Sequence, residues 1–350
     1  MKTNLPTPEN FSPPWFLRSG HVQTLLTGFY KPKATLPAPV VHKIPIGSQG
    51  NPGMHGHLLV YENRPSEAAQ ASGPHGAEEA VFLLHGLGSS HRGTYMTHLA
   101  SYLLEAGVRV FRFDLPGAGD SFEYTPLPPH GACSELLWEA LIQLSQNCSI
   151  RLWRGVGVSL GGNLLLKLLA NHASEIDTGD GTRNVSFASA IAVAPPIDLS
   201  KCCENMEIGA HRIYAKYFLR SLRSQARLRA DRWPEWKRLL ANASFETIRR
   251  FDETVTAPLA GFTSAEHYYE SGSSIGQLER IETPTTVLID KNDPIVPFSL
   301  FNGVRWSPST EVRISQRGGH IGYLHRSMTK TGRGLERWAD RWIATELMQS

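Results

Sequence analysis

The segment from Gly157 to Gly161 constrains this chain more than any other, because it reads Gly-x-Ser-x-Gly between two strongly patterned flanks. An apolar run typical of a buried strand precedes it, and an amphipathic helix-like run follows from Leu160. A serine in a sharp strand-to-helix turn takes strained backbone angles, and small residues two positions to either side avoid clashes. The pattern predicts a nucleophile at Ser159, although any glycine-rich turn from a strand into a helix would give the same letters.

Composition narrows the class of protein. The 350 residues are 41% hydrophobic and 19% charged, which is typical of a folded globular enzyme. A net charge of +3 gives no case for a nucleic-acid partner. The chain has neither a secretion signal at its start nor a run of 18 apolar residues. We therefore expect a cytoplasmic protein with reduced thiols; its cysteines, which form no Cys-x-x-Cys pair, are Cys133, Cys148, Cys202 and Cys203.

Strand-like and helix-like segments alternate along much of the chain. Strands are expected at 80–84, 108–113, 151–158, 187–194, 285–290 and 311–315, and helices at 95–106, 134–146 and 160–172. A leading antiparallel hairpin is expected from 40–46 and 55–61, followed by a loose surface loop at 65–79. This alternation predicts a mostly parallel sheet with helices on both faces.

A long interval without strand signals separates two parts of that sheet. It spans about 90 residues, which is too long for a simple crossover, and it reads as helices. We expect three parts: residues 1–79 as an N-terminal segment with leading strands packed on the core, residues 80–199 and 283–350 as the α/β core, and residues 200–282 as a helical cap. A cap there would lie above the strand ends, where α/β sheets bind ligands.

A serine hydroxyl needs a base and an orienting acid, and in folds of this kind the order along the chain is Ser, acid, His. Asp290 and Asp293 both lie in the turn after the strand at 285–290. We favour Asp293 because it lies further out in the loop, and Asp290 is kept as the reserve that would bond turn amides. His320, in a glycine-rich loop after the last strand signal, is the expected base, whereas His325 is expected inside the following helix.

The turn His85-Gly-Leu87-Gly follows the first strong core strand. Backbone amides at such a turn can point toward a reacting carbonyl oxygen, and the amide after the nucleophile supplies a second donor. We expect the amides of Leu87 and Leu160 to form an oxyanion hole.

No cofactor and no metal are expected. Neither phosphate-binding glycine motif, G-x-x-x-x-G-K-[ST] or G-x-G-x-x-G, occurs. His55 and His57 alternate along an expected strand, while His91 and His98 are seven residues apart on an expected helix with no carboxylate partners. None of these pairs matches the ligand sets of catalytic zinc sites.

The expected cap is strongly basic between residues 211 and 238, where nine Lys or Arg face two acids and leave a local net charge of +7. Apolar residues (Tyr214, Phe218, Leu222) and arginines (Arg220, Arg223, Arg227) fall on different faces of one helix. Such a helix could make weak contact with an anionic membrane surface. The alternative is an ordinary solvated helix face, which the same spacing also gives.

With these residues in place, the chain resembles the α/β-hydrolase superfamily, and more narrowly the YheT-like esterase group that includes eukaryotic α/β-hydrolase-domain lipases. The broad resemblance rests on the 85–88 turn, the 157–161 motif, Asp293 and His320. The narrower one rests on residues 14–24, 157–163 and 251–258, with Gly261-Phe and Tyr268-Tyr269.

The resemblance implies the α/β-hydrolase fold, a Ser159, Asp293 and His320 triad, and hydrolysis of medium-chain acyl esters or phospholipids. Two departures limit what can be carried over from this group to the substrate and the pocket. Eukaryotic members look anchored at the N-terminus by a segment that is absent here. In addition, residues 114–121 replace the more usual Arg-Gly turn. The sequence therefore predicts a serine hydrolase acting on a small-molecule ester or lipid. An acyltransferase with the same triad and a non-catalytic ligand-binding protein remain alternatives, and the oligomeric state is not predicted.

Overall fold

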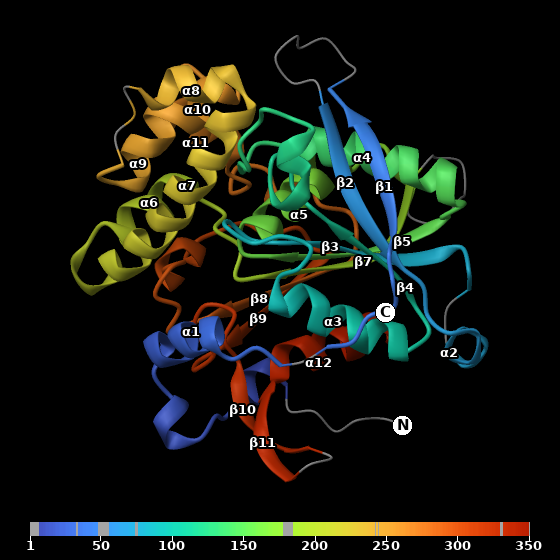
Figure 1. The fold of residues 1–350 in the computed structure, drawn as a ribbon. Helices are drawn as coiled ribbons and strands as arrows, with labels where there is room; N and C mark the ends of the chain where they lie inside the picture. Colours follow the sequence, from blue (N-terminus) through green and yellow to red (C-terminus); the bar gives the residue numbers. More distant parts are fainter. Residues whose placement is uncertain are drawn as a thin grey trace.

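A mostly parallel sheet runs through the computed structural model, which describes residues 7–32, 34–47, 56–73, 76–177, 185–241, 243, 245–329 and 332–349. Its strand order is β1-β2-β4-β3-β5-β7-β8-β9, with β6 paired to β7 (Figure 1). The strands are β1 (Val40–Ile46), β2 (Gly56–Asn63), β3 (Glu79–Leu84), β4 (Arg109–Phe113), β5 (Leu152–Val158), β6 (Ile176–Asp177), β7 (Val185–Val193), β8 (Thr285–Asp290) and β9 (Thr310–Ser315).

Strand direction follows the sequence pattern. The pairs β1/β2 and β2/β4 are antiparallel, and the remaining pairs of this sheet are parallel. The leading hairpin is confirmed for the described residues, with Val40 opposite Glu62; His55 lies outside them. Strands β3 and β5 are buried along nearly their whole length, as continuous apolar strands covered on both faces should be.

Helices cover the two faces of this sheet (Figure 1). One face packs on α3 (Thr94–Glu105) and α12 (Trp338–Leu347), and the other on α4 (Ser134–Cys148) and α5 (Leu160–Asn171). Residues 160–170 of α5 are all buried. The expected doubly covered α/β sheet is therefore confirmed, and the helix that follows Ser159 lies deep in the core.

The described residues between β7 and β8 form helices. We call residues 199–280 the cap segment; it contains α6 (Leu199–Met206), α7 (Arg212–Arg232), α8 (Pro234–Leu240), α9 (Ile248–Phe251), α10 (Ala257–Leu259) and α11 (Ala265–Gly272). Shorter helical turns occur at Pro8–Asn10, Trp15–Leu17, Gly119–Glu123, Gly209–His211, Asp252–Thr256, Leu278–Arg280 and Phe298–Phe301.

Hydrogen bonds between side chains and backbone join the cap segment to the core. In α7, the guanidinium of Arg229 donates to the carbonyl of Gly117 and lies 5.3 Å from the ring centre of Trp236. Burial lowers the pKa of Arg229 to about 10. The Asn163 amide of α5 donates to the carbonyl of Gly272 at 2.8 Å. These bonds fix the cap segment against the end of the sheet that carries Ser159.

Two local predictions are wrong. The expected loop at 65–79 contains a helix, α2 (Glu67–Ser72), because Ser66 caps its first turn and alanines favour the helix that follows. The chain after residue 320 first forms a hairpin, β10 (Leu324–Thr329) with β11 (Gly332–Arg337), and only then α12. His325 therefore lies in a strand and not in a helix.

Candidate active site

The turn between β5 and α5 has the strained geometry that its sequence predicts. Ser159 has φ 55° and ψ −123°, a region that residues with a side chain rarely adopt. A Cβ at Gly157 would lie 2.2 Å from the carbonyl oxygen of Gly161, and one at Gly161 would lie 2.4 Å from that of Leu84. Because both obstacles are backbone atoms, only glycine fits at either position.

Three distant side chains meet at this turn. His320 Nε2 lies 3.0 Å from Ser159 Oγ, and His320 Nδ1 lies 2.8 Å from Asp293 Oδ2. A carboxylate only accepts hydrogen bonds, so Nδ1 carries the hydrogen and Nε2 is free to accept the serine proton. His320 and Asp293 are buried, and Ser159 is partly exposed. The structure thus brings the sequence-predicted nucleophile, base and acid into one hydrogen-bonded row.

The two acid candidates have different places in the loop after β8. Asp293 Oδ1 accepts the backbone N–H groups of Ile295 and Val296, which leaves Oδ2 directed at His320. Asp290 instead accepts N–H groups from the loop that carries His320, those of Gly318 and Gly319 at 2.6 and 3.2 Å. Burial raises the pKa of Asp290. Asp290 therefore bonds turn amides, as its reserve role predicts.

The N-terminal helix α1 (Gly20–Phe29) holds the loop of His320, which sequence reasoning missed. Thr24 Oγ1 accepts the backbone N–H of His320 at 2.9 Å. The Gln23 amide accepts the N–H of Leu324 at 2.7 Å and donates to its carbonyl at 2.9 Å. Backbone groups engaged in this way cannot enter a helix, which explains why the chain around His325 is extended.

The turn after β3 is held by the side chains of His85, which is buried, and Tyr95, which is partly buried. His85 Nε2 accepts the N–H of Leu115 at 3.1 Å, so its Nδ1 donates to the carbonyl of Gly86 at 2.8 Å. Burial lowers the pKa of His85, which favours this neutral form. The hydroxyl of Tyr95 accepts the N–H of Gly86 at 2.7 Å. Sequence reasoning missed both roles, since neither residue type identifies its partner.

The predicted oxyanion donors lie next to Ser159. A Cβ at Gly86 would lie 3.0 Å from Ser159 Cβ, so the turn that contains Leu87 packs directly on the serine. Leu160 is the first residue of α5, where an amide has no acceptor four residues earlier in the helix. The oxyanion role of these two amides stays a prediction.

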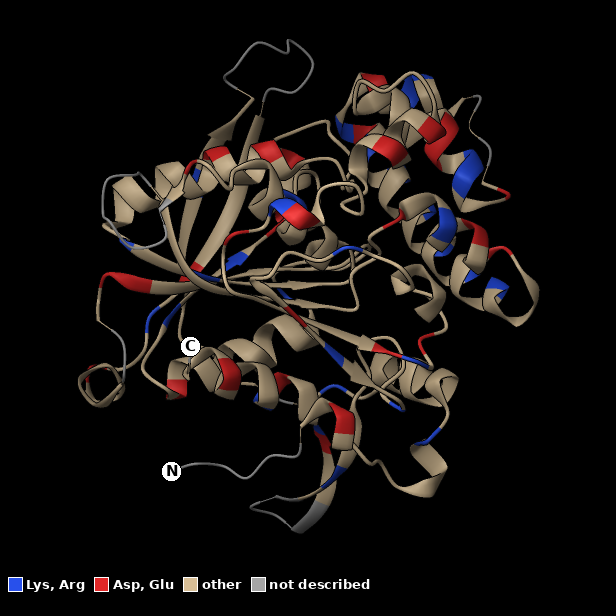
Figure 2. Cartoon of the chain, turned by 180° about the vertical axis from the view of Figure 1, so that it is seen from behind, with Lys and Arg blue, Asp and Glu red and all other residues tan. Residues whose placement is uncertain are grey.

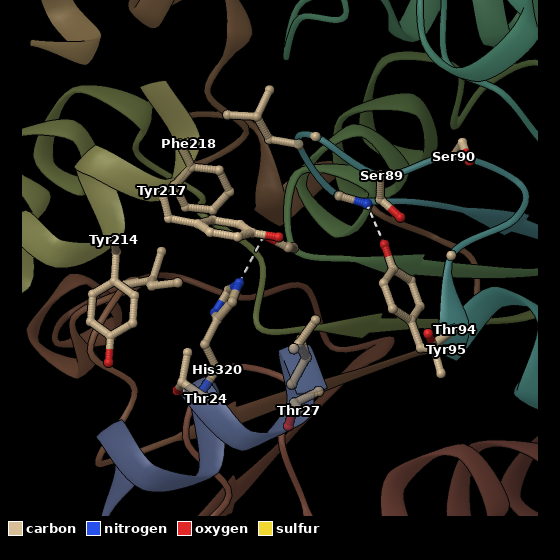
Figure 3. A pocket seen from close by; sticks show the side chains of 18 of the residues that line it. Thr24, Thr27, Ser89, Ser90, Thr94, Tyr95, Tyr214, Tyr217, Phe218 and His320 are labelled. Atoms are coloured by element: carbon tan, nitrogen blue, oxygen red, sulfur yellow. Dashed lines mark hydrogen bonds between the residues drawn. The ribbon is translucent and has the colours of Figure 1, made fainter. Parts of the chain in front are cut away.

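A cavity of about 770 Å³ opens at Ser159 and His320. Its walls come from α1, the segment at 86–95 and α7, and Figure 3 shows His320 between Thr24 on one side and Tyr217 and Phe218 on the other. The apolar share of these walls, together with a volume in the range of small-molecule sites, suits an organic substrate with a hydrocarbon part.

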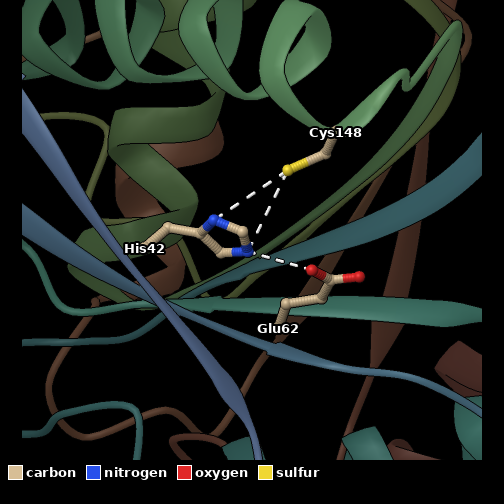
Figure 4. A group of neighbouring side chains, drawn as sticks. All are labelled: His42, Glu62 and Cys148. Carbon is tan, nitrogen blue, oxygen red and sulfur yellow. Dashed lines mark hydrogen bonds and ion pairs between the residues drawn. The ribbon is translucent and has the colours of Figure 1, made fainter.

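A second cluster contains potential metal ligands. His42, Glu62 and Cys148 each offer a ligand atom, all within 4.8 Å of one another (Figure 4). However, Glu62 also accepts guanidinium groups of Arg64 and Arg109 at 2.6 and 2.8 Å. Two adjacent cations oppose binding of a divalent ion, so we interpret the cluster as an ion-pair network that joins β1, β2, β4 and α4.

The contacts in this network change the pKa values of His42 and Glu62. Hydrogen bonding to Cys148 and then to Glu62 raises the pKa of His42 to about 9, and bonds from His42, Arg64 and Arg109 lower that of Glu62 despite its burial. The protonated imidazole is thus favoured at neutral pH.

The prediction that His91 and His98 have no carboxylate partners is wrong. His91 lies in a turn before α3, and its Nδ1 is 2.9 Å from a carboxylate oxygen of Asp114. His98 lies in α3, and its Nδ1 is 2.9 Å from a carboxylate oxygen of Asp340 in α12. Both partners are remote in the sequence, which is why the local pattern did not reveal them.

The fold and the serine turn define a class, and comparison with known families agrees: the chain belongs to the alpha/beta hydrolase family, whose model matches residues 81–330. Among curated proteins, "Putative esterase YheT" of Escherichia coli is 30% identical over 195 residues, 55% of this chain and 55% of that protein. Monoacylglycerol lipase of Saccharomyces cerevisiae is 26% identical over 285 residues, 77% of this chain and 58% of that protein. The matches thus span little more than half the length of these relatives.

Solved structures support the fold. The 2,6-dihydroxy-pseudo-oxynicotine hydrolase has a TM-score of 0.55 at 18% identity, over 94% of this chain and 71% of that one. In the described part of the chain, no helix combines the length and the apolar character needed to span a bilayer.

Proposed function

We propose that the protein hydrolyses carboxylic esters through an acyl-enzyme on Ser159. The observation that carries the proposal is the row Asp293, His320 and Ser159, with distances of 2.8 and 3.0 Å between the bonded atoms. The names of the curated relatives, an esterase and a monoacylglycerol lipase, support the same reaction class.

The proposed reaction has two halves. His320 Nε2 takes the proton of Ser159 as Oγ attacks the acyl carbon, and Asp293 stabilises the imidazolium that forms. The amides of Leu87 and Leu160 bind the oxyanion, and His320 then gives its proton to the leaving alcohol. Water, activated by the same imidazole, attacks the acyl-enzyme and releases the acid, which restores Ser159.

The substrate we propose is a small-molecule acyl ester or lipid ester with a chain that the cavity can cover. Leu25 and Phe29 of α1 and Tyr217 and Phe218 of α7 all line this cavity, so hydrocarbon in it would contact both helices. A panel of p-nitrophenyl esters of increasing acyl length tests this: kcat/KM should rise with chain length until the cavity is filled. A profile that falls from acetate onward would contradict an acyl-binding cavity.

The decisive test of the nucleophile is Ser159→Ala. We expect hydrolysis of p-nitrophenyl butyrate to fall by about 10⁴-fold or more, because the remaining triad members act only through the serine. The control is Ser224→Ala, at an exposed serine of α7, which should retain wild-type rates. Wild-type activity in Ser159→Ala would refute the proposal.

Labelling with a fluorophosphonate distinguishes hydrolysis from mere binding. Labelling that disappears in Ser159→Ala identifies an activated serine, whereas folded wild-type protein that resists the probe favours a non-catalytic binding protein. Product analysis with an added alcohol separates the acyltransferase alternative: a new ester in place of free acid would show that the alcohol replaces water at the acyl-enzyme.

A further inference from the structure

Exposed apolar side chains are concentrated at two segments beside the cavity. Eleven large hydrophobic side chains are exposed among the described residues, and nine of them lie at 15–29 or 208–228. Phe29 and Trp15 are 81% and 79% exposed, and Tyr217 and Ile208 are 69% and 67% exposed. Single exposed hydrophobic residues are ordinary, but such a concentration marks a surface that is covered by something else.

The two segments form one surface around the cavity mouth. His21 of α1 and the hydroxyl of Tyr214 in α7 are hydrogen bonded at 2.8 Å, and their rings are stacked. Five of the nine exposed side chains also line the cavity: Leu25, Phe29, Ile213, Tyr217 and Leu228. We call residues 15–31 and 208–228 the docking face.

Charge on the docking face has one sign. The docking face contains no Asp or Glu. Its seven exposed basic residues are Arg18, Lys31, Arg212, Lys216, Arg220, Arg223 and Arg227. Figure 2, the view from behind, shows both basic and acidic bands on the cap helices, and the residues of the docking face contribute only basic ones. Since the whole chain carries a net charge of +3, the docking face concentrates positive charge that the rest of the molecule offsets.

We propose that the docking face binds the surface of an anionic lipid bilayer, with the cavity mouth toward the lipid. Aromatic and aliphatic side chains would enter the boundary between headgroups and acyl chains, while Lys and Arg contact anionic headgroups. A second copy of the chain fits less well, because a two-fold interface would bring seven positive charges against the same seven.

The biological role of this membrane binding rests on the proposed ester hydrolysis. Binding to the bilayer itself requires no catalysis. An ester drawn from the bilayer would pass between α1 and α7 to Ser159 with little exposure of its chain to water. All binding measurements therefore use Ser159→Ala, so that loss of lipid binding and loss of hydrolysis are separate results.

Sedimentation with vesicles tests the proposal. At 50 mM salt, the protein should bind phosphatidylcholine vesicles that contain 30% phosphatidylglycerol at least tenfold more tightly than pure phosphatidylcholine, and 500 mM salt should remove most of the difference. Arg220→Gln with Arg227→Gln should lower the partition coefficient about 25-fold, since each basic side chain near an anionic surface contributes about fivefold. The matched control is Arg151→Gln with Arg305→Gln, which are 81% and 85% exposed outside the docking face and should change binding less than twofold.

A second pair of variants tests the apolar part. Trp15→Ser with Ile208→Ser should lower the partition coefficient about tenfold, whereas Val40→Ser with Val41→Ser, which are exposed on β1, should not change it. Neither Trp15 nor Ile208 lines the cavity, so in a Ser159 background both variants should hydrolyse dissolved p-nitrophenyl butyrate at the wild-type rate.

Three results would overturn the proposal: no binding of the protein to anionic vesicles at 50 mM salt, equal loss of binding in the docking-face and control variants, or a dimer in analytical ultracentrifugation that Trp15→Ser with Ile208→Ser dissociates. The last result would assign the face to a second copy of the chain.

Discussion

The hydroxyl of Thr24 provides a direct test of whether α1 positions His320, the proposed base. Its oxygen accepts the backbone N–H of His320 at 2.9 Å and donates to the carbonyl of Gly20 at 2.7 Å. Thr24→Val keeps the shape and branching of the side chain but removes both bonds. The important loss is at His320, which is 5% exposed, because its N–H is left without that acceptor.

The magnitude follows from this geometry. A buried N–H that loses its acceptor costs about 1–3 kcal/mol. If the loop of His320 moves away from Ser159 so that this N–H finds another partner, the arrangement in which His320 bonds Ser159 becomes about 5- to 150-fold less populated. We therefore expect kcat/KM for p-nitrophenyl butyrate to fall within that range, and fluorophosphonate labelling of Ser159 to slow by the same factor.

Thr27→Val is the matched control. Thr27 lies on the same helix and lines the same cavity, and its hydroxyl donates to the carbonyl of Gln23 at 2.7 Å, just as that of Thr24 donates to Gly20. Unlike Thr24, Thr27 has no hydrogen bond to His320 among the described contacts. The activity of the Thr27→Val variant should therefore stay within about twofold of wild type. Equal losses in the two variants, or no loss in Thr24→Val, would show that the reasoning is wrong.

Two further predictions concern stability. Gly161→Ala should unfold more easily by at least about 1–3 kcal/mol, because its Cβ would lie 2.4 Å from the carbonyl oxygen of Leu84, whereas Gly276→Ala, with nothing within 4 Å, should be neutral; equal melting temperatures for the two variants would contradict the packing argument. His42→Gln should reduce the free energy of unfolding by about 2 kcal/mol at pH 6, since the neighbouring thiol and carboxylate raise the pKa of His42 to about 9 and so stabilise its protonated form. This is less than the roughly 3 kcal/mol that the full pKa shift would give, because His42 is partly exposed to solvent. That contribution is complete below the unfolded pKa of about 6.5 and is lost as the pH rises through about 9, so urea unfolding should show no difference at pH 10.5; a constant difference would exclude this linkage.

The parts of the site that follow local rules were predictable from the sequence. The turn at Ser159 needs glycine where backbone approaches within 2.2 and 2.4 Å, and that requirement appears in five consecutive letters. The periodicity of apolar residues gave the parallel strands, and the strand ends then predicted where Asp293 and His320 would lie. Their separation in sequence was no obstacle, because the carboxyl ends of parallel strands meet at one edge of a sheet.

The supporting contacts were not predictable in the same way. Gln23 is an ordinary helix residue in the sequence, and nothing near it indicates a bond to Leu324. Tyr95 likewise shows no sign that its hydroxyl will hold Gly86. Each contact depends on how separate elements pack, which a local pattern does not contain, and for the same reason the chain at His325 was expected to be helical.

The bonds between Gln23 and Leu324 join residues 301 positions apart, which has a consequence for the order of events during synthesis. At about 5–20 residues per second, a ribosome needs roughly 15–60 s to make the chain between them. During that time α1, with the exposed Leu25 and Phe29, has no loop of His320 to pack on. A nascent chain can therefore fold most of its sheet and still be inactive, and its N-terminal apolar helix is the segment that a chaperone would have most time to bind.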